Sequence, residues 1–208
     1  MLLNCTVRPI PIAIARIPVE RHHYLHSFPG GTRLCLGVFV KADLQGVVVL
    51  GVGPRMAHRL VVGTNPEDGL TLTRLWLDDV LPRNSESWVI GQTVRVLRQY
   101  TPVKFLLSYA DPAVGHVGTI YQATNWIYTG LSQAQPALDL GDGVARHTRS
   151  VGSALGTYSI AYLRAQGIDA QRVPGTGKHR YVLFVDRRWR KRLAVATVPY
   201  PKKGALPS

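Results

Sequence analysis

Short runs of apolar residues recur along the chain at the length and spacing of β-strands. Strands favour β-branched and aromatic residues and are bounded by turn-forming residues. Six runs meet this description: Arg33–Val40, Gly46–Val52, Thr71–Leu77, Val103–Ser108, Trp126–Leu131 and Arg180–Val185. Six strands are enough to form a sheet that buries at least one face.

Two stretches between these runs have the periodicity of amphipathic helices. Ser85–Tyr100 follows Asn84, and both Asn84 and Ser85 are residue types that cap the beginning of a helix. Ser153–Gln166 repeats apolar residues at helical spacing and meets Gly167, a residue that ends helices. Strands with intervening helices predict a mixed α/β or α+β fold.

Length and composition indicate how many domains the chain forms and where in the cell it is found. The chain has 208 residues, of which 46% are apolar and 18% charged, so we expect a single globular domain over residues 1–208. No run reaches the roughly 18 to 20 apolar residues of a membrane span. The two cysteines, Cys5 and Cys35, are too few for a disulfide framework. We therefore expect a cytoplasmic protein with no membrane partner.

The charge is large and unevenly distributed. The chain carries 25 Lys and Arg against 12 Asp and Glu, a net charge of +13. Residues 145–208 hold 13 of these cations and 2 Asp, a net charge of +11, which leaves +2 for residues 1–144. An excess of this size indicates a polyanionic partner, and the basic C-terminal part 145–208 is the expected contact surface.

Aromatic residues lie among the C-terminal cations. Arg172–Arg192 contains a glycine-rich turn, a strand and five cations around Trp189. Cations interleaved with aromatic rings suit a phosphate backbone and stacked bases, although a charge run is more often a solvated surface. The residues predicted to contact nucleic acid are Tyr128, Arg149, Lys178, His179, Arg180, Arg187, Arg188 and Arg190.

Several enzyme classes lack their motifs in this chain. The sequence has no glycine-rich phosphate loop ending in Gly-Lys-Ser/Thr, no dinucleotide fingerprint, no nucleophile elbow and no HExxH helix. The histidines at 22, 23, 26 and 116 do not have the spacing of a metal cage. The residues alone therefore predict no metal site.

The segment Ser108–Gly130 concentrates polar and aromatic residues directly after a predicted strand, where α/β proteins often place their sites. Asp111 is either a general base or the N-cap of a helix over Gly115–Asn125. Tyr121 and Tyr128 either contact a ligand or pack in the core. The residue types leave both alternatives open.

Arg74 is unusual because alternation along Thr71–Leu77 places it between two large apolar side chains. A cation in such a position needs an anionic partner. That partner is either a phosphate or carboxyl group of a ligand, or Asp78 and Asp79 at the end of the strand. The second alternative makes Arg74 part of an internal ion pair.

Taken together, these residues resemble one known family. The features are His23-Tyr24, Arg74-Leu75, the run RNSES from Arg83, SYADPAVGH followed by GTIYQATNWIYTG, GKHRYV, and a PYPK sequence that begins at Pro199. They resemble the Mom family of phage DNA-modification proteins over most of the chain.

This resemblance implies a fold and an activity. It implies a GNAT-like acyltransferase fold with a central mixed, mostly antiparallel sheet flanked by helices. It also implies a transferase that installs a carbamoylmethyl group on adenine in phage DNA and so protects that DNA from host restriction nucleases. The residues that match positions needed for activity are Tyr24, Arg74, Asp111 and Tyr121, with His23 as their neighbour.

The donor of the transferred group is a separate question. Coenzyme A-binding members of the GNAT fold hold the pyrophosphate with a glycine-containing turn before a helix. Here the loop from Asp79 to Ser85 has no glycine, and the next one is Gly91. The predicted cofactor-binding residues at this helix start are Arg83, Asn84, Ser85 and Ser87. Candidate donors are a glycyl donor such as glycyl-tRNA, or acetyl-CoA with iron, for which His23 and Asp111 are weak candidate ligands.

Two other functions remain compatible with the sequence. A basic DNA-binding protein without catalytic activity would explain the charge, and a small-molecule GNAT N-acetyltransferase would explain the implied fold. The expected partner is double-stranded DNA, with tRNA as a further candidate. The sequence does not decide the oligomeric state, and a homodimer is one of the states it leaves open.

Overall fold

The computed structural model describes residues 5–202, which form two compact units. Within this range the first unit contains 5–109, 118–130 and 180–201, and the second contains 110–117, 131–179 and 202. The single domain over residues 1–208 stays a prediction, because the compactness of each unit does not test whether the two fold cooperatively.

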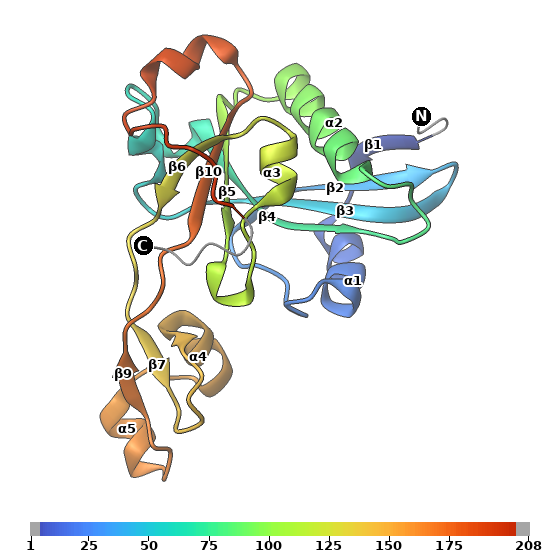
Figure 1. Ribbon diagram of the computed structural model, residues 1–208. Coiled ribbons are helices and arrows are strands. Elements are labelled where there is room, and N and C mark those ends of the chain that lie inside the picture. The colour runs from blue at the N-terminus through green and yellow to red at the C-terminus, as the bar shows by residue number, and fades with distance from the viewer. Residues whose placement is uncertain (1–4, 203–208) are drawn as a thin grey trace. The chain divides into compact units, whose positions relative to one another are not determined.

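The first unit contains a seven-stranded sheet in the order β1-β2-β3-β4-β5-β10-β6 (Figure 1). Neighbouring strands from β1 to β4 are antiparallel, and β4 and β5 are parallel. This confirms the mixed sheet predicted above. The strands are β1 (Cys5–Pro9), β2 (Thr32–Val40), β3 (Asp43–Gly51), β4 (Gly69–Leu77), β5 (Phe105–Ala110), β6 (Ile127–Leu131) and β10 (His179–Phe184).

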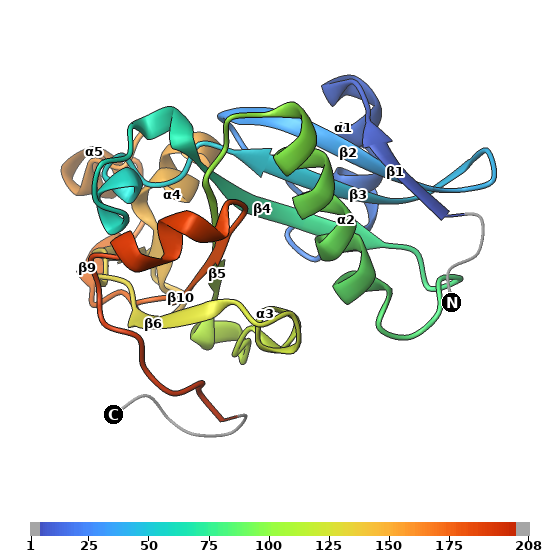
Figure 2. The same ribbon diagram turned by 90° about the horizontal axis from the view of Figure 1, so that it is seen from above.

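Helices cover both faces of this sheet (Figures 1 and 2). Helix α1 (Ile12–His22) buries Ala15 and Val19 against strands β2 and β3 and against Trp76. Helix α2 (Ser85–Tyr100) lies on the other face and buries one side of its surface. The sequence pattern predicted α2 but missed α1, because α1 contains Pro18 and buries only two residues.

The parallel ladder between β4 and β5 is short. It pairs Gly69 with Phe105 and ends where Thr71 pairs with Leu107. Beyond this point Ser108 donates its buried hydroxyl to the Leu72 carbonyl oxygen at 3.1 Å. On β4 this point is followed by Arg74, which belongs to the candidate site.

The second unit has a small sheet and two short helices. Strand β7 (Ala137–Asp139) lies between β8 (Arg146–His147) and β9 (Gln171–Val173), and the core consists of Leu138, Val151, Leu163 and Ala170. The helices are α4 (Thr148–Leu155) and α5 (Ile160–Ala165).

The prediction of one helix over Ser153–Gln166 was wrong. Helix α4 ends at Gly156, whose φ of 71° is left-handed, and the Ser159 side chain caps the beginning of α5. Apolar spacing continues through this turn because both helices contribute to one core, and periodicity alone does not detect the break.

The alternative helix over Gly115–Asn125 was also wrong in extent. A 3-10 turn (Pro112–Val114) precedes helix α3 (Thr119–Ala123), and Gly115 and Gly118 both have φ of 73°. These left-handed residues interrupt a continuous helix. Within residues 5–202, no helix is long and apolar enough to cross a membrane.

Candidate active site

Arg74 lies half-buried on β4 and is held by neutral oxygen atoms. Its Nε donates to the Ser27 carbonyl oxygen at 3.1 Å, Nη1 donates to the Thr73 carbonyl oxygen at 2.8 Å, and Nη2 donates to the Ser27 hydroxyl at 3.3 Å. Of the two alternatives for Arg74, the internal ion pair with Asp78 or Asp79 was wrong, since the part of the chain described here gives Arg74 no salt bridge. The guanidinium therefore keeps its charge without a carboxylate partner.

His23 and Tyr24 follow the last turn of α1 and lie close to Arg74. The His23 ring stacks on Tyr24 with centroids 4.5 Å apart, and its Nδ1 accepts the Leu25 backbone N–H at 3.2 Å. Burial, then the nearby Arg74 charge, lower the pKa of His23 from 6.5 to about 4. His23 is therefore neutral at physiological pH, with the proton on Nε2.

Tyr121 on α3 completes this cluster. Burial raises its pKa, its hydroxyl interacts with that of Ser108, and Tyr24 is close enough to interact with it electrostatically. Tyr24 also interacts with Arg74, which links the two residues. The structure thus brings together four of the predicted catalytic residues: His23, Tyr24, Arg74 and Tyr121.

The Tyr121 ring belongs to an aromatic cluster behind the site. Its centroid lies 5.0 Å from that of Trp126 and 5.2 Å from that of Tyr181. Tyr128 is buried and packs against Tyr181 at 5.1 Å. This packing agrees with the alternative in which Tyr128 is part of the core. It does not test the predicted contact of Tyr128 with DNA.

Asp111 belongs to the second unit and makes two interactions there. One carboxylate oxygen accepts the Ala113 backbone N–H at 3.0 Å, which caps the 3-10 turn, and the other pairs with Lys178 Nζ at 3.0 Å. Asp111 therefore caps a shorter element than the helix considered from the sequence. Its role as a general base stays a prediction, as does the DNA contact of Lys178.

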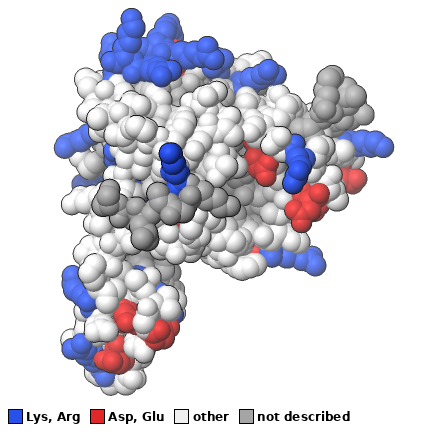
Figure 3. Space-filling view, in the orientation of Figure 1, with Lys and Arg blue, Asp and Glu red and all other residues white. Residues whose placement is uncertain are grey.

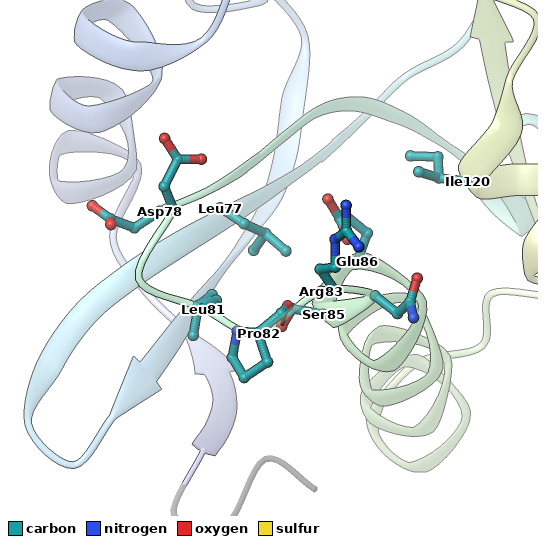
Figure 4. A pocket seen from close by; sticks show the side chains of 10 residues that line it. Leu77, Asp78, Leu81, Pro82, Arg83, Ser85, Glu86 and Ile120 are labelled. Atoms are coloured by element: carbon teal, nitrogen blue, oxygen red, sulfur yellow. Dashed lines mark hydrogen bonds between the residues drawn. The ribbon is translucent and has the colours of Figure 1, made fainter.

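A pocket of about 600 Å³ opens at the beginning of α2 (Figure 4). Three of the predicted cofactor-binding residues, Arg83, Asn84 and Ser85, line it, whereas Ser87 does not. Asn84 occupies the N-cap position, as predicted, but its side chain makes no capping hydrogen bond, and the Ser85 hydroxyl donates to the Pro82 carbonyl oxygen. The first-turn N–H groups of α2 therefore lack a side-chain acceptor from Asn84.

The charges around this pocket are mostly negative. Asp78, Asp79 and Glu86 line it together with Arg83, and Figure 4 shows Arg83 and Glu86 extending from the start of α2. Three carboxylates against one guanidinium oppose the binding of a pyrophosphate, which favours cations and backbone N–H groups.

The cations predicted to contact DNA lie at several places. Arg187, Arg188 and Arg190 are exposed on the 3-10 segment η4 (Arg187–Arg192), within the basic patch at the top of Figure 3. Trp189 anchors this segment, with Lys104 Nζ 4.3 Å and the Arg192 guanidinium 4.7 Å from its ring centroid. Arg188 is paired with Asp186 at 2.8 Å.

The remaining predicted contacts differ in accessibility. His179 is buried, and burial lowers its pKa. Arg180 donates from Nε to the Thr129 hydroxyl at 2.8 Å, and Arg149 is exposed on α4. Their contacts with DNA stay predictions.

Two supporting serines were not predicted. Ser27 orients Arg74, and Ser108 lies next to Tyr121 at the end of the parallel ladder. No local pattern distinguishes these serines, because their partners are distant in sequence. In the described residues, no group of three or more His, Cys, Asp or Glu has the arrangement of a metal site.

Comparisons with known proteins give independent information on this chain. Among solved structures it is similar to a spermidine N-acetyltransferase from Vibrio cholerae, with a TM-score of 0.49 and 7% identity, covering 90% of this chain and 98% of that one. It is also similar to an N-acyl amino acid synthase from uncultured soil microbes, with a TM-score of 0.49 and 11% identity, covering 91% and 95%.

Sequence comparison is more specific. The chain is 35% identical over 203 residues to the protein named methylcarbamoylase mom of Escherichia phage Mu, covering 94% of this chain and 83% of the relative. The pattern of the Mom protein family matches residues 4–202. This range includes all of the residues that form the cluster around Arg74, and the chain belongs to the Mom protein family.

Proposed function

We propose that this protein is a DNA-modifying transferase that converts adenine in phage DNA to its carbamoylmethyl form and thereby protects the DNA from host restriction nucleases. The observation that carries this proposal is the cluster of His23, Tyr24, Arg74 and Tyr121 in a chain of the Mom family. The exposed cations of η4 provide a surface for the phosphate backbone.

Arg74 is suited to stabilise negative charge that develops during group transfer. A guanidinium has five N–H donors, and the Ser27 and Thr73 oxygen atoms accept three of them. Among the described residues, two donors are therefore left for a developing oxyanion, and Tyr24 interacts electrostatically with the same guanidinium. Because Ser27 fixes the guanidinium, little reorganisation is required when the charge appears.

From the family resemblance alone, we propose Asp111 as the group that accepts a proton from the exocyclic amine of adenine. That amine lies in a base pair of duplex DNA, so the target base must leave the stack or be unpaired before reaction. Neutral His23 offers an Nε2–H donor and cannot act as a cation at physiological pH.

An activated glycine accounts for the product without an oxidant. Transfer of the glycyl group to the exocyclic amine forms an amide and releases the carrier hydroxyl. The free glycine amine then attacks ring carbon 6, which closes a five-membered spiro intermediate. Cleavage of the original carbon–nitrogen bond expels the adenine nitrogen as the carboxamide. The glycine nitrogen remains on the ring, and atoms and electrons balance.

We propose glycyl-tRNA as this donor. The basic surface that binds DNA would also bind a tRNA acceptor end, and no pyrophosphate site is required. The acidic pocket at α2 supports this choice, since it suits an ammonium group better than coenzyme A phosphates.

Acetyl-CoA with iron is the competing donor system. Simple acetyl transfer would join adenine to the acyl carbon, whereas carbamoylmethyl is joined through its alkyl carbon. The described residues do not fit an iron site, because His23 and Asp111 do not belong to a group of three metal-ligating side chains. We therefore assign no step to iron.

Labelled precursors test the activity and the donor together. Cells that express the protein are fed glycine labelled at both carbons and nitrogen, or labelled acetate, and their DNA nucleosides are analysed by mass spectrometry. We expect all three glycine labels in the modified adenine, with the glycine nitrogen on the purine ring. Label from acetate alone would contradict the glycyl donor.

Modified adenine in this experiment would exclude both alternative functions, because a non-catalytic DNA-binding protein and a small-molecule N-acetyltransferase each leave adenine unmodified. Calorimetry with coenzyme A separates these two alternatives, since only the N-acetyltransferase would bind it. Duplex DNA is the proposed substrate, and the host cell cytoplasm is the proposed location.

A further inference from the structure

Helices α4 and α5 of the second unit contain no acidic residues. No Asp or Glu occurs from Gly143 to Ile168, a stretch that contains both helices and three arginines. Arg146 is paired with Asp142, whereas Arg149 is exposed and has no salt-bridge partner among residues 5–202. The charged side chains that the two helices themselves carry, Arg149 and Arg164, are therefore both cationic.

Two tyrosines of this stretch are exposed although their unit has a well-formed core. Tyr158 in the turn between the helices is 65% exposed and Tyr162 on α5 is 57% exposed, while Val151 on α4 and Leu163 on α5 are buried. Exposed aromatic rings are costly in water and commonly mark a contact surface. The two rings do not contribute to the core of the unit.

The ring of Tyr158, which lies in the turn after α4, packs on the side of α4 that carries Arg149. Gly152 follows Arg149 by three residues, which places both on one face of the helix. The position of a Cβ atom on Gly152 would be 3.3 Å from Tyr158 Cδ1, so the tyrosine ring lies beside this glycine. The turn between the helices is fixed by the Thr157 hydroxyl, which accepts the Ser159 N–H at 3.1 Å, and by the Ser159 cap.

We propose that this surface is a second DNA contact, in which Tyr158 and Tyr162 stack on unpaired bases and Arg149 binds a phosphate. The inference rests on the proposed function, because modification of the adenine amine requires an opened base pair and so exposes base faces. Its support is charge complementarity with DNA together with aromatic rings that single-strand binders use for stacking.

Fluorescence anisotropy with two DNA probes tests this assignment. One probe is a fully paired duplex, and the other has the same sequence with a short unpaired bubble around adenine. We expect Tyr158→Ala with Tyr162→Ala to weaken binding to the bubble by about 10-fold or more and binding to the duplex much less. The Phe double variant should keep binding within about twofold, because the stacking ring remains.

Charge and aromatic contributions are separated by the salt dependence. Arg149→Gln should lower the slope of log affinity against log salt by about 0.7 to 0.9, whereas the tyrosine variants should leave this slope unchanged. Tyr100→Ala is the matched control, since Tyr100 is 71% exposed at the end of α2 in the first unit. This control should bind both probes like the unchanged protein.

The proposal is overturned if the Ala double variant binds the bubble like the unchanged protein. It is also overturned if sedimentation velocity shows that the unchanged protein is a dimer and the Ala double variant a monomer, while the variant keeps its affinity for the bubble. Thermal melting shows whether each variant is folded. If the melting temperature of the double variant is well below that of the unchanged protein, the two single variants are tested instead. Failure of the proposed function is distinct, since it is an absence of modified adenine in cells with the unchanged protein.

Discussion

Replacement of Tyr24 by Phe removes one hydroxyl and keeps the aromatic ring. The ring of Tyr24 stacks on His23 at 4.5 Å, and phenylalanine preserves this contact. Tyr24 is 56% exposed, so the variant opens no cavity in the core. Changes at such positions usually alter the free energy of unfolding by no more than about 0.5 kcal/mol. We therefore expect a melting temperature within a few degrees of the unchanged protein.

The expected effect on the reaction is much larger. If the Tyr24 hydroxyl supports the oxyanion beside Arg74, its loss should slow modification by about 10² to 10³, which corresponds to about 2.7 to 4 kcal/mol of transition-state stabilisation. Quantitative mass spectrometry of DNA nucleosides, followed over time at matched protein levels, measures this rate. Tyr100→Phe serves as the control, because this tyrosine is also exposed but is the last residue of α2 and does not belong to the cluster around Arg74.

Two results would refute this reasoning. Retention of more than about a tenth of the modification rate would show that the hydroxyl does not act in the transition state. A large fall in melting temperature would show that Tyr24 instead has a structural role. A loss of activity with unchanged melting and unchanged DNA affinity is the result expected for a catalytic group.

Three further perturbations test other parts of the structure. The pKa of folded His23 is about 4, below its ordinary 6.5, so the unfolded chain binds more protons between these two values. The free energy of unfolding should therefore rise with pH across this window, by at most about 3 kcal/mol. Chemical denaturation at several pH values should show a flatter profile for His23→Asn. Ser27→Ala removes the Oγ acceptor of Arg74 but keeps the backbone one, and we expect about a fivefold slower modification in the nucleoside assay with a stability change below about 1 kcal/mol. Conversion of Arg187, Arg190 and Lys191 to Gln should lower the salt slope of duplex binding by about 2 to 3, and an unchanged slope would remove η4 from the DNA contact.

Much of the fold was predictable because its signals are local. Each of the six predicted strands is present within three residues of its expected bounds, and α2 extends over Ser85–Tyr100 as predicted. Alternation and helical spacing record which face of an element is buried, so they identify elements that pack on a continuous core. Elements with weaker patterns were missed: β1 is a short edge strand, and α1 contains Pro18.

The candidate site was only partly predictable. The family resemblance identified His23, Tyr24, Arg74 and Tyr121, and the structure brings these four together. Local reasoning about Arg74 left two alternatives, an anionic group of a ligand or Asp78 and Asp79, which are its acidic neighbours in sequence. Two of the three hydrogen bonds that the structure gives Arg74 go to Ser27, 47 residues away.

The sequence by itself determined the mixed sheet, the helix after β4, the large basic excess and the family. Tertiary structure decided the hydrogen bonds of Arg74, the neutral state of His23, the break at Gly156 and the anchoring of η4 through Trp189. The reason is physical. Periodicity reports neighbours two to four residues apart, whereas hydrogen-bond partners and desolvation depend on which distant segments the folded chain brings into contact.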